Sequence, residues 1–241
     1  MTRHSDQGPP RRGLFITFEG GEGSGKSTQV EGLRDRLRAQ GHVVVATREP
    51  GGSIGAEAVR HVLLSGAAEA LGPEAEAVLL SAARADHIAS VIAPALARGE
   101  IVLSDRFHDS TRVYQGQDPK ADQTFLGNLE RATLGGLYPD LTIILDIPAV
   151  EGLARAAKRR GRRAADRFEK EAVSRHEARR RAFLEIAQAE PERCVVVDAR
   201  QPADAVAAEI AALVEDRLDA ARMDRVGDAF AADTAPLVEP R

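Results

Sequence analysis

Cysteine, tryptophan and long apolar runs are scarce in this chain. Its 241 residues include one cysteine, Cys194, and no tryptophan, and aromatic residues account for only 4%. A single cysteine excludes an intramolecular disulfide, and its place in the apolar run 194–197 is typical of a small buried strand residue. No apolar run approaches the length that spans a membrane. We therefore expect a cytoplasmic protein with no membrane partner.

A large excess of charge of one sign is also missing. The chain has 33 basic and 37 acidic residues and a net charge of −4, so its bulk electrostatics do not favour a polyanion, and any basic function must be local. The apolar fraction of 43% is enough for a substantial core. Residues 1–12 lack the apolar core of a signal peptide, and we expect them to form a disordered N-terminal extension.

The segment Gly20–Ser27 fits the phosphate-binding pattern Gly-x4-Gly-Lys-Ser/Thr. It follows the apolar run 14–18, which predicts a buried strand, and it precedes 28–37, whose apolar residues share one helical face. Backbone N–H groups of such a loop converge on phosphate oxygens, helped by the helix dipole. A glycine-rich turn that binds nothing is the alternative, which the strand before it and the helix after it disfavour.

We expect this segment to bind the phosphates of a nucleoside triphosphate. Lys26 would add a full positive charge, and the Ser27 hydroxyl is placed to bind Mg2+. The residues expected to contact the triphosphate are Gly20, Gly21, Glu22, Gly23, Ser24, Gly25, Lys26, Ser27 and Thr28.

Five apolar, β-type runs alternate with helical patterns, which predicts an α/β fold of three layers with a five-stranded parallel sheet flanked by helices. The expected strands are 14–18, 43–46, 101–104, 141–146 and 194–197. The expected helices are 28–37, 54–64, 74–98 with a kink or end at Pro94, 110–114, 122–134, a helix from 150, 168–189 and 202–218. We expect one domain over 13–218 and a flexible C-terminal tail at 219–241.

Polar residues follow three of the expected strands. Ligands of such sheets bind beyond the carboxyl ends of the strands, and Arg48, Asp105-Arg106 and Asp146 stand there. Asp105 closes an apolar strand, where a carboxylate can reach Mg2+; an ordinary ion pair with Arg106 is the alternative. Phosphoryl transfer to an anionic acceptor needs several arginines from separate loops, and Arg84 adds another.

A basic stretch covers residues 158–163. Charge runs are usually solvated faces, and arginine-rich segments often bind nucleic acid. The negative net charge and the lack of nearby aromatic residues apart from Phe168 argue against nucleic acid. Gly161 amid the arginines favours a mobile basic lid at about 158–168 that closes on polyphosphate. The lid residues expected to act in catalysis are Arg159, Arg160, Arg162 and Arg163.

Four further motifs accompany the phosphate loop. They are Thr-Arg-Glu-Pro-Gly-Gly at 47–52, Asp-Arg-x3-Ser-Thr-x2-Tyr-Gln-Gly at 105–116, Pro-Asp-Leu-Thr-x2-Leu-Asp at 139–146 and Asp-Arg-Phe-Glu at 166–169. Together they resemble the bacterial thymidylate kinases, a family of P-loop nucleoside monophosphate kinases, from about residue 13 to 215. The resemblance implies transfer of the γ-phosphate of ATP to dTMP with Mg2+, in dTTP synthesis, usually by a homodimer.

The resemblance also implies roles for single residues. In catalysis, Lys26, Asp105 and Arg106 join the lid arginines, and Ser27 and Asp105 bind the metal. Around dTMP, the expected residues are Arg48 and Arg106 at the phosphate, Glu22 near the 3′-hydroxyl, Tyr114 at the sugar, Arg84 at the thymine edge, and Ser110, Thr111 and Gln115 completing base recognition. The backbone near Arg200 would border adenine.

Leu80 departs from the family pattern, which usually has an aromatic ring there to stack on thymine. Because stacking is worth about 1–3 kcal/mol, we expect weaker base binding or looser selectivity. A P-loop kinase for another nucleoside monophosphate is therefore an alternative. A nucleic-acid-binding P-loop ATPase is a further alternative, although no strand ends in the Asp-Glu pair of such proteins.

Overall fold

Five parallel strands form the centre of the molecule. The computed structural model describes residues 12–161 and 171–233. Its strands are β1 (Phe15–Glu19), β2 (Val44–Arg48), β3 (Ile101–Asp105), β4 (Leu141–Asp146) and β5 (Cys194–Asp198), in the order β2-β3-β1-β4-β5. All neighbouring strands are parallel. The predicted α/β class and the five predicted strands are thereby confirmed.

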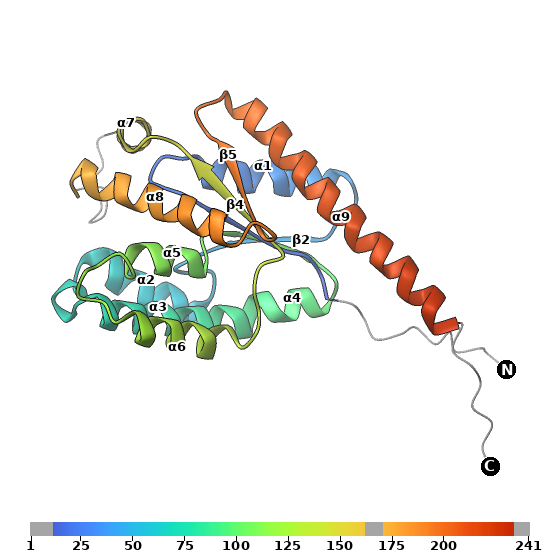
Figure 1. Ribbon diagram of the computed structural model, residues 1–241, viewed down its shortest axis with the longest axis horizontal. Helices are drawn as coiled ribbons and strands as arrows, with labels where there is room; N and C mark the ends of the chain where they lie inside the picture. Colours follow the sequence, from blue (N-terminus) through green and yellow to red (C-terminus); the bar gives the residue numbers. More distant parts are fainter. Residues whose placement is uncertain (1–11, 162–170, 234–241) are drawn as a thin grey trace, which may run out of the picture.

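Helices cover both faces of this sheet (Figure 1). They are α1 (Lys26–Ala39), α2 (Ile54–Ser65), α3 (Pro73–His87), α4 (Ala93–Ala97), α5 (His108–Tyr114), α6 (Gln123–Leu134), α7 (Ala149–Arg160), α8 (Val173–Ala189) and α9 (Ala203–Asp233). Since strand side chains alternate between faces, Ile16 and Phe18 pack on α1 and α9, whereas Phe15 packs on α4 and α6. Ile144 packs on α5 and α8.

The segment expected to kink or end at Pro94 instead contains a π-helical turn, Ile88–Ile92, between α3 and α4. Proline has no N–H, and its ring clashes with the carbonyl four residues earlier in an α-helix. A wider turn immediately before Pro94 relieves that clash. The helix therefore continues to Ala97 instead of ending at the proline.

The last helix also differs from the expectation. It runs to Asp233, whereas regular structure was expected to end at Leu218. The segment 219–233 is rich in alanine, which favours helix. The N-terminal extension, most of the expected lid and the last residues of the tail lie outside the described residues. None of the described helices combines the length and apolar character needed to span a membrane.

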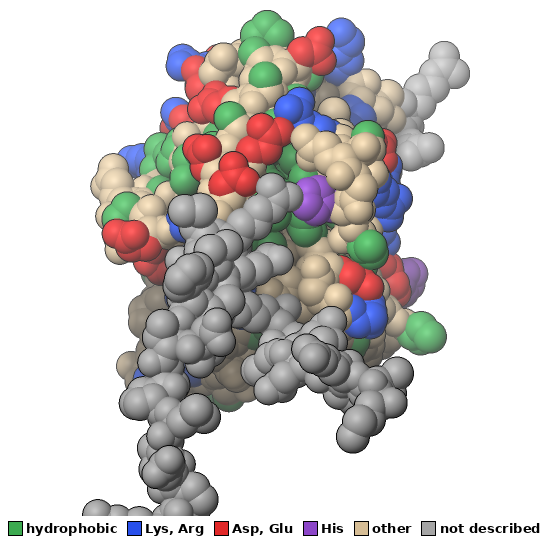
Figure 2. Space-filling view, turned by 90° about the vertical axis from the view of Figure 1, so that its right-hand side faces the viewer, with side chains coloured by type: hydrophobic (Ala, Val, Ile, Leu, Met, Phe, Trp, Pro, Cys, Tyr) green, Lys and Arg blue, Asp and Glu red, His purple; other side chains and the backbone are tan. Residues whose placement is uncertain are grey.

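Figure 2 shows acidic and basic side chains interspersed on the face that it presents. This mixture agrees with the small net charge of −4. The carboxyl ends of the strands carry the residues considered next.

Candidate active site

The phosphate loop connects β1 to α1 and packs directly on α7. Gly20, Gly23 and Gly25 have φ angles of 133°, 71° and 95°, a region that side chains of L-residues rarely permit. A Cβ atom on Gly23 would lie 1.9 Å from the carbonyl oxygen of Gly152, and one on Gly152 would lie 2.3 Å from that of Glu22. Glycine is therefore required on both sides of this contact.

Lys26 lies at the centre of the loop. Its side chain is buried, and its ammonium group donates hydrogen bonds to the carbonyl oxygens of Gly20 at 3.0 Å and Gly21 at 2.8 Å. Burial and the nearby positive charge of Arg106 lower the pKa of Lys26 to about 8, against the attraction of Glu22 and other carboxylates. The positively charged group of Lys26 thus lies in the loop, where the pattern predicts a residue that binds phosphate.

Ser27 and Asp105 meet across the carboxyl ends of β1 and β3. The Ser27 hydroxyl donates to Asp105 Oδ2 at 2.5 Å. Hydroxyl and carboxylate oxygens suit Mg2+, which usually binds through one or two carboxylates plus substrate phosphates. Among the described residues, no cluster of three or more His, Cys, Asp or Glu side chains could hold a metal ion. A metal here would therefore depend on these two residues and on substrate oxygens.

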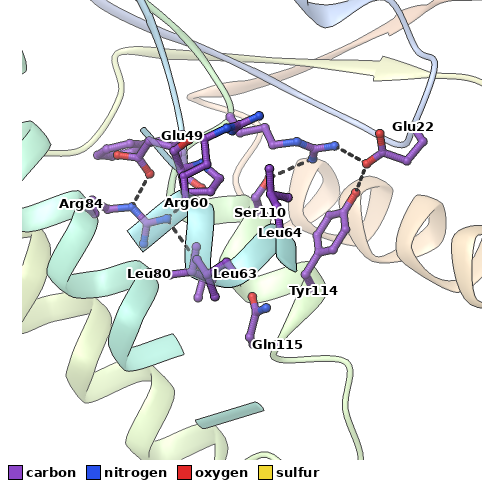
Figure 3. Close-up of a pocket in the computed structure, with 14 residues that line it drawn as sticks. Glu22, Glu49, Arg60, Leu63, Leu64, Leu80, Arg84, Ser110, Tyr114 and Gln115 are labelled. Atoms are coloured by element: carbon purple, nitrogen blue, oxygen red, sulfur yellow. Dashed lines mark hydrogen bonds and ion pairs between the residues drawn. The ribbon is translucent and has the colours of Figure 1, made fainter. Parts of the chain in front are cut away.

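Arg106, Glu22 and Tyr114 form a charged cluster beside the loop. Arg106 donates to Glu22 Oε1 at 2.7 Å, and the Tyr114 hydroxyl donates to the same oxygen at 3.0 Å (Figure 3). Burial alone would raise the pKa of Glu22, but the charges of Arg106 and Lys26 and the Tyr114 hydrogen bond lower it to about 2. Glu22 is consequently an ionised acceptor at neutral pH.

The backbone at Arg106 has a left-handed conformation. Its φ of 73° is the only positive value for a non-glycine residue in the described part of the chain. Such strain persists where the surroundings hold it, and here the Arg106 N–H donates to the carbonyl oxygen of Phe18 at 2.9 Å. The guanidinium also donates to Ser110 Oγ at 3.1 Å. The turn after β3 thus aims Arg106 at the phosphate loop.

A cavity of about 170 Å³ opens between this cluster, α2, α3 and α5 (Figure 3). Leu63 and Leu64 of α2 and Leu80 of α3 form its apolar wall. The complete lining is Glu22, Glu49, Pro50, Arg60, Leu63, Leu64, Leu80, Arg84, Arg106, Phe107, Ser110, Thr111, Tyr114 and Gln115. We call this space the acceptor cavity.

Two polar side chains are positioned at the deep side of the acceptor cavity. Arg84 donates through Nε to Glu49 at 2.7 Å and through Nη2 to Thr111 Oγ1 at 2.9 Å. Gln115 Nε2 donates to a carboxylate oxygen of Glu76 at 3.3 Å. A carboxylate only accepts at neutral pH, so this contact fixes the amide orientation. Gln115 Oε1 has no hydrogen-bond partner among the described residues.

Glu19 lies beneath this cavity, fully buried at the end of β1. Its carboxylate accepts hydrogen bonds from the backbone N–H of Phe107 at 2.8 Å, the backbone N–H of Ser110 at 3.1 Å and the Ser110 hydroxyl at 2.6 Å. Burial and the negative charge of Asp109 raise the pKa of Glu19 to about 7, although Arg106 opposes the shift. Glu19 therefore anchors the start of α5.

A second cavity, of about 500 Å³, lies on the other side of the phosphate loop. We call it the donor cavity. Its lining includes loop and α1 residues and three arginines: Gly23, Ser24, Gly25, Thr28, Arg155, Arg159 and Arg200. Arg155 donates to the carbonyl oxygen of Ala199 at 2.8 Å, and exposed Arg200 pairs with Asp198. The loop thus separates two cavities.

The structure brings together most of the predicted site residues. The residues that line the acceptor cavity as expected are Glu22, Leu80, Arg84, Arg106, Ser110, Thr111, Tyr114 and Gln115. Arg159 and Arg200 line the donor cavity, whereas Arg160 is the last residue of α7. Arg162 and Arg163 lie outside the described residues.

Arg48 lies outside the lining of the acceptor cavity. It ends edge strand β2 with 54% of its side chain exposed, and it pairs with Glu57 of α2 at 2.7 Å. The lining contains Arg60 instead, which donates to the carbonyl oxygen of Pro50 at 2.7 Å. Arg60 was not predicted, because one arginine on a helix carries no motif. Glu49, the neighbour of Arg48 in the sequence, pairs with Arg84 of α3.

The fold and the site together define a class: a P-loop nucleotide kinase fold, with phosphate loop, strand-end Asp-Arg and a cavity on each side of the loop. Comparison with known proteins narrows the class. The family model for thymidylate kinase matches residues 18–210. The chain belongs to the thymidylate kinase family, as its motifs predicted.

Individual relatives agree with this assignment. A thymidylate kinase of Afipia carboxidovorans is 53% identical over 221 residues, covering 92% of this chain and 97% of the relative. One of Bradyrhizobium is 54% identical over 209 residues, covering 87% and 92%. The crystal structure of thymidylate kinase from Ehrlichia chaffeensis superposes with a TM-score of 0.64 at 32% identity, covering 84% of this chain and 99% of the other.

Proposed function

We propose that this enzyme transfers the γ-phosphoryl group of ATP to dTMP and forms dTDP, a step of dTTP synthesis. The observation that carries the proposal is the lining of the acceptor cavity, which includes the Arg106–Glu22 pair at the phosphate loop and Arg84 and Gln115 on its deep side. A nucleoside monophosphate matches it, with an anionic phosphate at one end and a base with polar edges at the other. Family membership supports thymine as the base.

Phosphoryl transfer requires two mutually repelling phosphates to be aligned, and positive charge makes this possible. Lys26 and the N–H groups of the phosphate loop bind the donor phosphates. Arg106 and Arg60, which both line the acceptor cavity, bind the acceptor phosphate; Arg48 would have to leave Glu57 to join them. The arginines at and after the end of α7, which are Arg159, Arg160, Arg162 and Arg163, contact the transferred group.

Ser27 and Asp105 are the proposed residues for Mg2+. Their short contact supports this role, since two oxygen ligands already lie together beside the loop. Bound Mg2+ neutralises negative charge on the phosphoryl oxygens. Asp105 directly precedes Arg106, so one turn supplies both a metal ligand and an acceptor ligand.

Base recognition uses the deep side of the acceptor cavity. Arg84 Nη1, which has no hydrogen-bond partner among the described residues, donates to the thymine edge. Gln115 Oε1 accepts from the base, and Ser110 and Thr111 complete the polar contacts. Leu80 covers the base face.

The sugar and the donor nucleotide take the remaining positions. Tyr114 packs against the deoxyribose, and ionised Glu22 accepts from the 3′-hydroxyl. The donor adenine lies in the donor cavity, bordered by the backbone at Arg200.

A homodimer is part of the same proposal. Exposed apolar side chains on three adjacent helices support an interface there: Val62 of α2 is 40% exposed, Val78 of α3 44% and Phe125 of α6 38%. Burial of such side chains between two subunits is favourable. Size-exclusion chromatography with light scattering measures the mass, and a monomer at micromolar concentration would contradict this part.

The decisive assay couples ADP release to a panel of monophosphates, namely dTMP, dUMP, dCMP, dAMP and dGMP, at saturating ATP and Mg2+. We expect the highest kcat/KM with dTMP. The second candidate is a kinase for another deoxynucleoside monophosphate, favoured by Leu80 in place of an aromatic ring. Preferred turnover of another member of the panel would establish that candidate and refute ours.

A further inference from the structure

His87 joins a buried chain of polar side chains that ends at the acceptor cavity. Its ring is fully buried on α3, one turn after Arg84. Nδ1 lies 3.1 Å from Glu49 Oε1, and Nε2 lies 2.7 Å from Thr47 Oγ1. The other carboxylate oxygen of Glu49 accepts from Arg84 Nε at 2.7 Å. These four residues link the end of β2 to the base-facing side of the cavity, and we call them the His87 chain.

The direction of each hydrogen bond follows from the chemistry of its members. Burial opposes a charge on Glu49, but Arg84 and His87 outweigh it and lower the pKa of Glu49. An ionised carboxylate only accepts, so His87 Nδ1 must donate to it. In the tautomer that carries its proton on Nδ1, Nε2 accepts from the Thr47 hydroxyl. The two neighbours of His87 therefore select one tautomer and one ring orientation.

Packing leaves this chain little freedom. A Cβ atom on Gly52 would lie 2.4 Å from Thr47 Oγ1 and 2.5 Å from His87 Nε2, so the loop backbone packs directly on that pair. The side chains of Arg84 and Glu49 are 3% and 5% exposed. Because loss of one partner from a buried ion pair is strongly destabilising, the pairing with Glu49 holds Arg84 in its present position.

The position of Arg84 determines what it can offer to a base. Nε is bonded to Glu49, and Nη2 to Thr111 and to the carbonyl oxygen of Phe107. As far as the described residues are concerned, Nη1 is the nitrogen of Arg84 that remains for a ligand. Because a guanidinium is planar, the direction of Nη1 follows from the plane of the Glu49 carboxylate, and His87 fixes that plane through its second oxygen.

We propose that His87 is a positioning residue that orients Arg84 through Glu49 and thereby determines which base the enzyme selects. The proposal rests on the proposed function of Arg84 as the donor to the base edge. Leu80 supports the proposal. Because Leu80 has no aromatic ring to stack on the face of the base, selection between bases depends more on the hydrogen bonds to the polar edge of the base. Thymine presents an acceptor where cytosine presents an amino donor, so a displaced Nη1 loses that discrimination.

Two substitutions of His87 separate positioning from packing. In His87→Asn the amide nitrogen takes the place of Nδ1 and keeps the bond to Glu49. In His87→Gln the amide reaches the place of Nε2 and leaves Glu49 without this partner. Both variants put an amide into the same buried space, so a merely structural role would affect them alike. Thr47→Val keeps the shape of Thr47 but removes the hydroxyl.

The measured quantity is the ratio of kcat/KM for dTMP to kcat/KM for dCMP. We expect His87→Gln to lower it about tenfold, the equivalent of 1.4 kcal/mol, through a higher KM for dTMP at little-changed kcat. We expect His87→Asn and Thr47→Val each to lower the ratio only about threefold, because both keep the bond to Glu49 and lose the contact between Thr47 and Nε2. Thermal unfolding of each variant confirms that it is folded.

Equal ratios in the two His87 variants would overturn the proposal. If neither variant folds, an unchanged ratio in Thr47→Val would overturn it, and a lowered ratio would support it. The wild-type ratio tests a separate point: a wild-type enzyme that does not prefer dTMP refutes the proposed function. In that case the role of His87 is still decided by whether the ratio differs between His87→Gln and His87→Asn.

Discussion

Replacing Leu80 by phenylalanine tests where the base lies in the acceptor cavity. Leu80 lines this cavity from α3, four residues before Arg84, together with Leu63 and Leu64 of α2 (Figure 3). A phenylalanine ring at this position would be presented to the face of a base whose edge is held by Arg84. The variant is therefore expected to bind dTMP more tightly.

The size of the effect follows from the structure. Base–aromatic stacking is worth about 1–3 kcal/mol relative to alanine, and leucine already supplies part of that contact. The net gain should be about 1 kcal/mol, or roughly a fivefold lower KM for dTMP. Leu80 is only half-buried beside a cavity of about 170 Å³, so the ring can be accommodated without repacking the core.

The assay is steady-state kinetics with dTMP at saturating ATP, with Leu79→Phe as the matched control. Leu79 is the preceding residue on the same helix, is also half-buried, and lies outside the lining of the acceptor cavity. We expect its substitution to leave KM within about twofold of wild type. An unchanged or higher KM in Leu80→Phe, with the control unchanged, would show that the base does not lie against Leu80.

Three further predictions follow from the phosphate loop and Glu19. Lys26→Ala should lower kcat by about 10²–10³-fold with an unchanged circular dichroism spectrum; wild-type turnover would contradict its place on the phosphates. Glu19 has a native pKa of about 7 against an ordinary value of 4.5, so the native state loses stability as pH rises through this window. Relative to Glu19→Gln, the wild-type free energy of unfolding should fall by about 2 kcal/mol between pH 5 and pH 8 in urea titrations; parallel pH profiles would refute this. Gly152→Ala puts a Cβ 2.3 Å from the Glu22 carbonyl oxygen and should raise the KM for ATP about tenfold. The control Gly32→Ala, whose Cβ would have nothing within 4 Å, should leave this KM unchanged. Equal KM values for ATP in the two variants would contradict the contact between the phosphate loop and α7.

The strands and the phosphate loop could be predicted because their signals are local. Each strand is an apolar run of a few residues, and the loop combines glycines, Lys26 and Ser27 in consecutive positions. Ser27 and Asp105 were each expected to bind the metal, and they lie together because parallel strands place their carboxyl ends at one edge of the sheet.

Contacts that depend on which elements lie side by side could not be predicted. Glu49 and Arg48 are neighbours in sequence, but only the approach of α3 to the loop after β2 pairs Glu49 with Arg84. Arg60 lines the acceptor cavity because α2 lies against that loop, where Arg60 donates to the carbonyl oxygen of Pro50. No spacing in the sequence reveals this contact. The π-helical turn before Pro94 is likewise a compromise between local sterics and continued packing of Ile92 and Leu96.

The acceptor cavity and the donor cavity are lined by residues from different parts of the chain. Apart from Glu22, the whole lining of the acceptor cavity falls within residues 49–115. The donor cavity draws on 23–29 and 155–206. The residues proposed to contact the base therefore all belong to one uninterrupted block of the chain between β1 and β4. We expect a change of base preference to require substitutions in that block, with the residues that bind the donor nucleotide left as they are.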